Sequence, residues 1–210
     1  MAPNGLTSLR TLVEVLRRPR VGLGMLSAAL VFTGHFAFFT YIRPFLETVT
    51  LVGVSGISSI LLGFGIANFL GNLLAGLMLE RSIRFTLVVM PMSMGVIGLS
   101  LAGLGGIPLL DAAMVALWGL AFGAVPVAWS TWLTRTVPDE AESAGGLLVA
   151  AIQLAIASGA AAGGLIFDMS GAVGVFSASG CVLLLAALVI LFGVQARPAA
   201  STIQGAGCEA

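Results

Sequence analysis

The stretch VGLGMLSAALVFTGHFAFFTYIR, residues 21–43, decides how the rest of the chain can fold. It contains about 20 apolar or small residues in succession, the length that an α-helix needs to cross the hydrocarbon core of a bilayer. The segment therefore predicts a membrane span. Its second half also contains a histidine and two threonines among phenylalanines, and polar groups at that depth are unfavourable unless they face protein or a wet cavity. We expect part of this helix to face something other than lipid.

Composition points to the same class of protein. Of the 210 residues, 59% are hydrophobic and 9% are charged, and the mean hydropathy is +1.11. Because soluble domains contain roughly a quarter charged residues, the chain is expected to be a multi-pass membrane protein in contact with the lipid bilayer. Its net charge is zero, so no basic surface for nucleic acid is expected. Cys181 and Cys208 are too few for a disulfide framework or a metal site, and no cofactor is expected.

The hydropathy pattern predicts an all-α membrane protein with six transmembrane helices. Their expected bounds are 21–43, 57–79, 85–104, 108–133, 144–167 and 172–194. Residues 21–194 therefore form the predicted transmembrane domain. Residues 1–20 are expected to be a cytoplasmic segment with a short amphipathic helix at 6–16, and residues 195–210 a disordered cytoplasmic tail.

The positions of the arginines predict the orientation in the membrane. If the N-terminus is cytoplasmic, eight arginines lie in cytoplasmic segments, namely Arg10, Arg17, Arg18, Arg20, Arg81, Arg84, Arg135 and Arg197. Only Arg43 lies on the other side. Arginine in short loops favours the cytoplasmic side, so both termini are expected in the cytoplasm.

The six predicted spans differ in polarity in a way that suggests a repeat. The first, second, fourth and fifth contain polar side chains at mid-depth, whereas the third and sixth are almost wholly apolar. Each group of three spans thus contains two inward-looking helices and one lipid-facing helix. This is the pattern of a 3+3 transporter repeat, in which the binding site lies where the repeats meet.

Two amides mark the second predicted span. Asn68 and Asn72 share one face with Gly65 and Gly76, because the four residues lie three or four positions apart. Small residues let two helices approach closely, and amides hydrogen-bond across such contacts. Packing against another helix and contact of the amides with a substrate both stay open.

The fourth and fifth predicted spans add indoles and a third amide. Gln153 lies in the middle of a face of alanines and glycines, where it either packs or contacts a substrate. Trp118 lies deep in its span, where its ring either packs or offers a stacking surface to a planar ligand. Trp132, near the cytoplasmic end, is expected in the aromatic belt at the membrane interface.

The first span contributes the remaining candidates. Thr33, Phe36 and Thr40 share one side by their spacing, whereas His35 points elsewhere. His35 is the one mid-membrane group that titrates near neutrality, and a role in proton coupling or ligand contact and a structural hydrogen bond both stay open. No carboxylate, cysteine or second histidine lies beside it in sequence, so an enzyme is not favoured. The candidate substrate-cavity residues are thus Thr33, His35, Phe36, Thr40, Asn68, Asn72, Trp118 and Gln153.

Charged residues also lie at the predicted outer ends of the spans. Arg43, Asp111 and Asp168 are candidates for an outer gate, for example through a pair between Arg43 and Asp168. The alternative is that they are ordinary solvated charges at helix ends.

The segment GLMLERSIR, residues 76–84, resembles a loop of the major facilitator superfamily. It is similar to the glycine–acid–arginine loop that follows the second and eighth helices in that superfamily, with glutamate where aspartate is usual. The resemblance implies a latch between helices at the cytoplasmic face. The matching residues are Gly76, Glu80, Arg81 and Arg84.

Longer blocks resemble bacterial drug- and sugar-efflux antiporters of that superfamily, and among these the purine ribonucleoside efflux pumps. The blocks are TGHFAFFTYIRPFLE (33–47), PVAWSTWLTR (126–135), DEAESAGGLLVAAIQLA (139–155) and GAAAGGLIFDMSG (159–171). The resemblance implies the C-terminal six-helix half of a proton-coupled exporter in the bacterial inner membrane.

Such a half lacks an opposing wall, so the partner that it implies is an N-terminal six-helix half or a second copy of the chain. The chain alone is not expected to transport. The implied substrate is a purine ribonucleoside. A sugar or drug exporter, a non-transporting membrane subunit and a truncated gene product remain alternatives.

Overall fold

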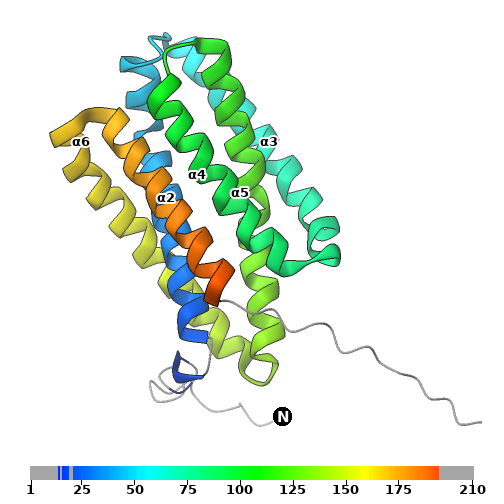
Figure 1. Cartoon of the computed structure of the whole chain (residues 1–210). Coiled ribbons are helices and arrows are strands. Elements are labelled where there is room, and N and C mark those ends of the chain that lie inside the picture. Colours follow the sequence, from blue (N-terminus) through cyan, green and yellow to red (C-terminus); the bar gives the residue numbers. More distant parts are fainter. Residues whose placement is uncertain (1–13, 15, 19–20, 194–210) are drawn as a thin grey trace, which may run out of the picture.

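A computed structural model describes residues 14, 16–18 and 21–193, and over these residues the fold is all-helical (Figure 1). Five of its helices are long and apolar enough to cross a membrane. They are α2 (Val21–Thr48), α3 (Val54–Arg81), α4 (Ile83–Leu104), α5 (Pro108–Thr136) and α6 (Ala141–Gly193), and the short 3-10 helix η1 (Pro138–Glu140) joins the last two. The prediction of an all-α membrane protein is confirmed for this part of the chain. The amphipathic helix expected at 6–16 and the tail at 195–210 lie outside the described residues, apart from residues 14 and 16.

The first four helices match the predicted spans to within a few residues, and their ends have local causes. Helix α2 continues beyond Arg43, through Pro44, to Thr48, and three residues later Leu51 adopts a left-handed backbone with φ 58°. Ser82 begins α4, and its hydroxyl accepts a hydrogen bond from the Phe85 amide. Pro108 occupies the first turn of α5, where its missing amide proton is not needed.

Helix α6 contains both of the last two predicted spans. Gly171 interrupts it with φ 65° and ψ −168°, values that a side chain would strain and that glycine tolerates. The chain reverses direction in this region, between the yellow and orange parts of Figure 1. We refer to residues 141–170 and 172–193 as the first and second arms of α6. The prediction of six separate helices is thus not confirmed, because the described residues form five such helices, and the break expected between the last two spans is a sharp turn inside α6.

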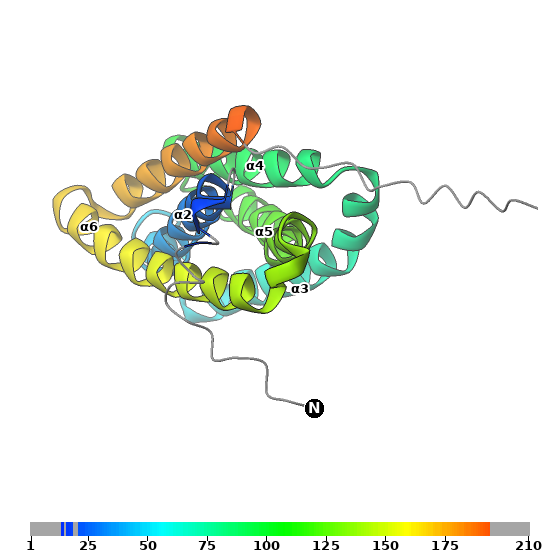
Figure 2. The ribbon, with the colours of Figure 1, turned by 90° about the horizontal axis from the view of Figure 1, so that it is seen from below.

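Glycines set how closely the helices pack. The α3–α5 contact is close because a Cβ atom at Gly119 would lie 2.5 Å from the Phe64 carbonyl oxygen. Helix α2 touches both arms of α6: Gly159 lies against the Thr33 carbonyl, and Gly34 lies against Leu183. Helix α4 packs against α5 and the second arm, as the end-on view shows (Figure 2). The largest buried side chains fill the middle of this arrangement; they are Trp118, Trp129, Trp132, Phe38, Phe45 and Phe176.

Polar contacts tie the helices together at both ends of the bundle. At one end, which we call the arginine end, Arg18 pairs with Asp139 at 2.8 Å and Arg84 donates to the Leu191 carbonyl at 2.7 Å. At the opposite end, Thr50 and the Gly106 amide both donate to Asp111. The α3–α4 and α5–α6 connections both lie at the arginine end, so five described arginines gather there, and Arg43 lies at the other end.

Candidate functional site

The centre of the candidate site is a buried hydrogen bond between α5 and α2. The indole nitrogen of Trp118 donates to Nδ1 of His35 over 3.1 Å, and both side chains are buried. Because Nδ1 accepts this bond, the proton of the neutral imidazole lies on Nε2. His35 is therefore a hydrogen-bond acceptor at Nδ1, and its second nitrogen is a donor.

Aromatic rings surround His35. Its imidazole stacks on Phe122 of α5 with ring centroids 3.3 Å apart and an interplanar angle of 3°. Phe36 contacts it edge-on at 5.0 Å, and Phe64 of α3 lies 6.5 Å away. Trp118 stacks in turn on Phe38 at 3.6 Å. The histidine thus joins α2, α3 and α5 within one layer of π surfaces.

Most of the other predicted cavity residues lie around this layer. Thr40, Asn72 and Gln153 are exposed, and Thr33, Phe36 and Asn68 are half-buried. The contacts that connect them run from α6 through α2 and α5 to α3: Thr33–Ser158 at 3.4 Å, Phe36–Phe122 at 6.4 Å and Asn68 to the Gly119 carbonyl at 3.3 Å. We call the set Thr33, His35, Phe36, Asn68, Asn72, Trp118, Phe122 and Ser158 the polar–aromatic strip.

Two predicted cavity residues are less closely tied to the strip. Thr40 lies one turn beyond Phe36 on α2. Gln153 is exposed on the first arm of α6, five residues before Ser158 and hence on a different side of that arm. Gln153 makes no hydrogen bond to another described residue.

The glycine positions differ from what spacing suggested. Gly65 and Gly76 lie in open space, with no atom within 4 Å of a Cβ atom built on either. The close approach of α3 to α5 depends instead on Gly71, Gly119 and Gly123. The hypothesis that Gly65 and Gly76 pack against another helix is thus wrong within the described chain, because the neighbouring face of α3 is the one that meets α5.

Trp132 also lies elsewhere than predicted. It is buried, and its ring lies against Gly24 of α2, so it is not in an interfacial belt. Its indole nitrogen has no hydrogen-bond partner among the described residues. The prediction failed because the residue at the facing position of α2 is glycine, which leaves room for an indole between the helices.

The three outer-gate candidates have different environments. Arg43 pairs with Glu47, one turn away on α2, at 2.8 Å, and not with Asp168. Asp168 is exposed near the end of the first arm. Asp111 is fully buried, and its Oδ2 accepts from Thr50 at 2.7 Å and from the Gly106 amide at 3.0 Å. Asp111 therefore joins the α2–α3 connection to the α4–α5 connection.

The loop residues Gly76, Glu80, Arg81 and Arg84 are all exposed at the arginine end. Arg84 donates to the last turn of the second arm, at Leu191, which gives it the geometry of a latch between α4 and α6. Sequence reasoning missed the partners Phe122 and Ser158, because no local pattern distinguishes a phenylalanine or serine that faces another helix.

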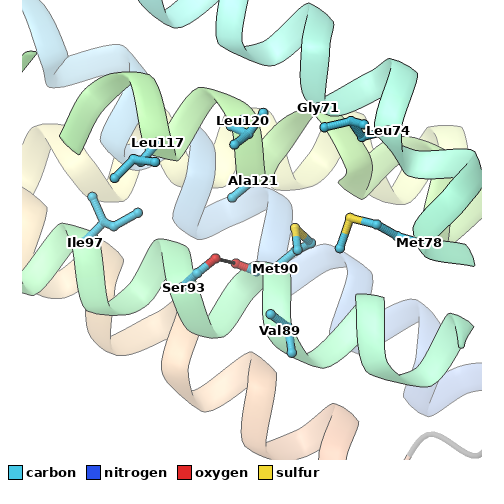
Figure 3. A pocket seen from close by; sticks show the side chains of 10 residues that line it. All are labelled: Gly71, Leu74, Met78, Val89, Met90, Ser93, Ile97, Leu117, Leu120 and Ala121. Carbon is cyan, nitrogen blue, oxygen red and sulfur yellow. Dashed lines mark hydrogen bonds between the residues drawn. The ribbon is translucent and has the colours of Figure 1, made fainter. Parts of the chain in front are cut away.

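One cavity lies away from the strip, between α3, α4 and α5 (Figure 3). Its volume is about 390 Å³, and none of the predicted site residues lines it. The lining residues are Gly71, Leu74, Met78, Val89, Met90, Ser93, Ile97, Leu117, Leu120 and Ala121. We call this cavity the α3–α4 groove. No group of three or more histidine, cysteine or acidic residues in the described ranges could hold a metal ion.

The five long apolar helices are those of a multi-pass membrane protein. The chain is similar to the transcription regulatory protein OpdE of Pseudomonas aeruginosa, with 44% identity over 187 residues, which are 89% of this chain and 46% of the relative. It is also similar to the purine ribonucleoside efflux pump NepI of Salmonella enteritidis and of Salmonella typhimurium, with 41% identity over 189 residues, 90% of this chain and 48% of each relative. The chain spans about half the length of these relatives. No family model and no solved structure matches it.

Proposed function

We propose that the chain is one half of an efflux transporter of the major facilitator type, which exports a purine ribonucleoside or a related small polar solute by alternating access. The observation that carries the proposal is the polar–aromatic strip on a chain 41% identical to purine ribonucleoside efflux pumps. A purine ring suits the aromatic surfaces of Phe36 and Phe122, and ribose hydroxyls suit the hydroxyl of Thr33 and the amides of Asn68 and Asn72.

The membrane topology of this half has six spans and not five. Each arm of α6 crosses the bilayer, because the first arm has 30 residues and the second 22, and about 20 residues suffice. The arginine end faces the cytoplasm of a bacterial inner membrane, since arginine is retained on that side. Both chain ends are then cytoplasmic.

A second six-helix unit completes the transporter. The chain covers about half of its relatives, and smooth exposed positions remain on two helices, at Gly65 and Gly76 of α3 and at Gly146 and Ala150 of α6. Small exposed residues let another set of helices approach. The second unit is an N-terminal half or a second copy, and rocking of the two units exposes the strip to either side in turn.

Proton coupling passes through His35 in this proposal. A proton that binds Nδ1 must replace the Trp118 hydrogen bond, so protonation and the position of α5 relative to α2 are linked. His35→Ala should lower the pH dependence of export in the completed transporter. An unchanged pH profile would remove His35 from the coupling.

The transport test uses the full chain in two preparations. One contains the chain alone, and the other contains the chain joined behind the preceding half of the Salmonella relative. In inverted vesicles with a pH gradient, the joined protein should accumulate labelled inosine in excess over a labelled hexose, and the chain alone should not. Accumulation of hexose without inosine would reject the nucleoside class, and transport by the chain alone would reject the need for a second unit.

A second candidate function is a part in transcription regulation, favoured by the 44% identity to a relative with that name. An effect on transcript levels that persists when the transport variants are inactive would favour it. If variants that lose transport also lose the effect on transcript levels, the regulation is a consequence of transport.

A further inference from the structure

We propose that the α3–α4 groove binds one acyl chain of a phospholipid, with its headgroup at the arginine end. The groove belongs to a different surface from the polar–aromatic strip, and the inference holds whether or not the chain transports.

The lining chemistry excludes a polar solute. All but one of the side chains that line the groove are hydrocarbon or thioether (Figure 3). The exception, Ser93, already donates its hydroxyl to the Met90 carbonyl of its own helix at 2.8 Å. A nucleoside or sugar would therefore lose its hydrogen bonds to water on entry and gain none. An apolar occupant loses nothing.

The position of the groove matches one leaflet of a bilayer. It begins at Met78, about 6 Å along the helix axis from the α3–α4 turn at Ser82, and on α4 it reaches Ile97, about 22 Å from that turn. Its length along the helices is thus about 16 Å. Half of a hydrocarbon core is about 15 Å thick. The groove therefore runs through the depth at which acyl chains lie, and it is open to them, because Leu74 and Leu117 at its rim are 47% and 54% exposed.

The walls suit a flexible chain better than another helix. Helices that pack closely in membranes use small residues at the contact, whereas long side chains form the rim here. Met78 and Met90 are unbranched and adapt to an irregular occupant. Van der Waals contact with a disordered methylene chain is the interaction that such walls offer.

A charge at one end of the groove fixes the direction of the lipid. Leu74, Met78 and Arg81 follow one another at i, i+4 and i+7 and lie on one side of α3. Arg81 is exposed one turn beyond the groove and makes no hydrogen bond or ion pair with another described residue. Its guanidinium lies at the depth of lipid phosphates, to which it can donate.

Four methionines allow the test to be done on the intact chain. Met78 and Met90 line the groove, Met92 is 52% exposed on the outer side of α4, and Met94 is fully buried. The full chain is placed in bilayers that contain phosphatidylglycerol with a diazirine in the middle of one acyl chain. The bulk lipid is then exchanged for probe-free lipid, the sample is irradiated, and the labelled residues are mapped by mass spectrometry.

A bound acyl chain should leave severalfold more label on Met78 and Met90 than on Met92, with none on Met94. Ser93→Phe, which fills the groove, should remove this excess. Ser177→Phe is the matched control, because Ser177 is, like Ser93, a half-buried serine whose hydroxyl bonds its own helix, and it does not line the groove.

If the label on Met78 and Met90 falls during the lipid exchange as fast as the label on Met92, the inference is overturned. This outcome is measured on the unmodified chain and so does not depend on the stability of the variants. Excess label that survives Ser93→Phe would also overturn it. Crosslinks from Met90 to a second copy in place of lipid would assign the groove to a protein contact.

Discussion

Helices α5 and α3 are nearly equal in length and apolarity and yet have opposite surroundings. They contain 29 and 28 residues, and their most apolar stretches have the same mean hydropathy. In α5, 50% of that stretch is buried inside the chain, against 17% in α3. Hydropathy therefore assigns both helices to the membrane and says nothing about which of them forms the centre of the protein.

The residues that separate the two helices are small or aromatic. Helix α5 brings Trp118, Trp129 and Trp132 into the interior, and Gly119 and Gly123 allow close contact with α3. Helix α3 presents leucines, Ile66 and Phe69 outward along most of its length. The contact between them is thus asymmetric: α5 is enclosed, and α3 keeps free faces for lipid and, in the proposed transporter, for a second unit.

A substitution at the α5 side of this contact should have the largest effect. In Gly119→Ala the added Cβ atom would lie 2.5 Å from the Phe64 carbonyl oxygen, and backbone cannot move aside as a side chain can. We expect a loss of about 1–3 kcal/mol in the free energy of unfolding. Unfolding in mixed micelles with SDS, followed by tryptophan fluorescence, measures it.

The same substitution on the free face of α3 provides the control. Gly65→Ala meets no atom within 4 Å and should stabilise the helix by up to about 1 kcal/mol through its propensity. Equal losses in the two variants would contradict the asymmetry between the helices.

The start of α5 should be the next most sensitive point. Asp111→Ala leaves the Thr50 hydroxyl and the Gly106 amide without their acceptor. Thr50 is buried, and an unsatisfied buried donor destabilises by about 1–3 kcal/mol. Asp168→Ala, at an exposed carboxylate, should change the stability by less than about 0.5 kcal/mol. The same denaturation assay compares them. Similar values would mean that the buried carboxylate does not hold the two connections together.

The spans could be predicted from the sequence because their cause is local. A run of about 20 apolar residues must lie in hydrocarbon, and Pro108 and Gly171 mark a start and a turn through their own backbone preferences. The arginines gather at one end for a similar reason, since each follows or precedes a span. The helix bounds at α4 and α5 follow from these signals.

The contacts between helices could not be predicted in this way. Trp118 meets His35 across 83 positions, and Ser158 meets Thr33 across 125. Spacing identified a face with Gly65 and Gly76, but the contact with α5 uses Gly71 on the neighbouring face. The α3–α4 groove has no sequence signal, because a void depends on three helices that diverge and not on any one of them.

The middle of α5 should show a smaller effect. Trp118→Phe keeps a ring against Phe38 but removes the donor to His35, so a loss of about 1 kcal/mol is expected from the hydrogen bond. Trp132→Phe removes the same volume without a hydrogen bond, because that indole nitrogen has no partner among the described residues. The difference in the free energy of unfolding between the two variants measures the contribution of the hydrogen bond between Trp118 and His35. Combining each variant with His35→Ala shows whether the interaction energy with His35 is specific to Trp118.

The smallest effect is expected just past the end of α5, where Asp139 of η1 pairs with Arg18. The hydrogen bond from Arg18 lowers the pKa of Asp139 below its usual 3.8. A carboxyl group with a lowered pKa in the folded chain contributes stability above its unfolded pKa, and this contribution disappears as the pH falls through the folded pKa. Asp139→Asn should therefore lower the melting temperature slightly at pH 7 and leave it unchanged once the pH is well below 3.8.

Glu142→Gln, at an exposed carboxyl nearby, controls for the loss of charge. Because the pair is exposed, salt should weaken it, and high ionic strength should bring the native chain and Asp139→Asn together at pH 7. A difference in melting temperature between the native chain and Asp139→Asn that grows as the pH falls would contradict the ion pair. Packing alone would then stabilise the start of α6.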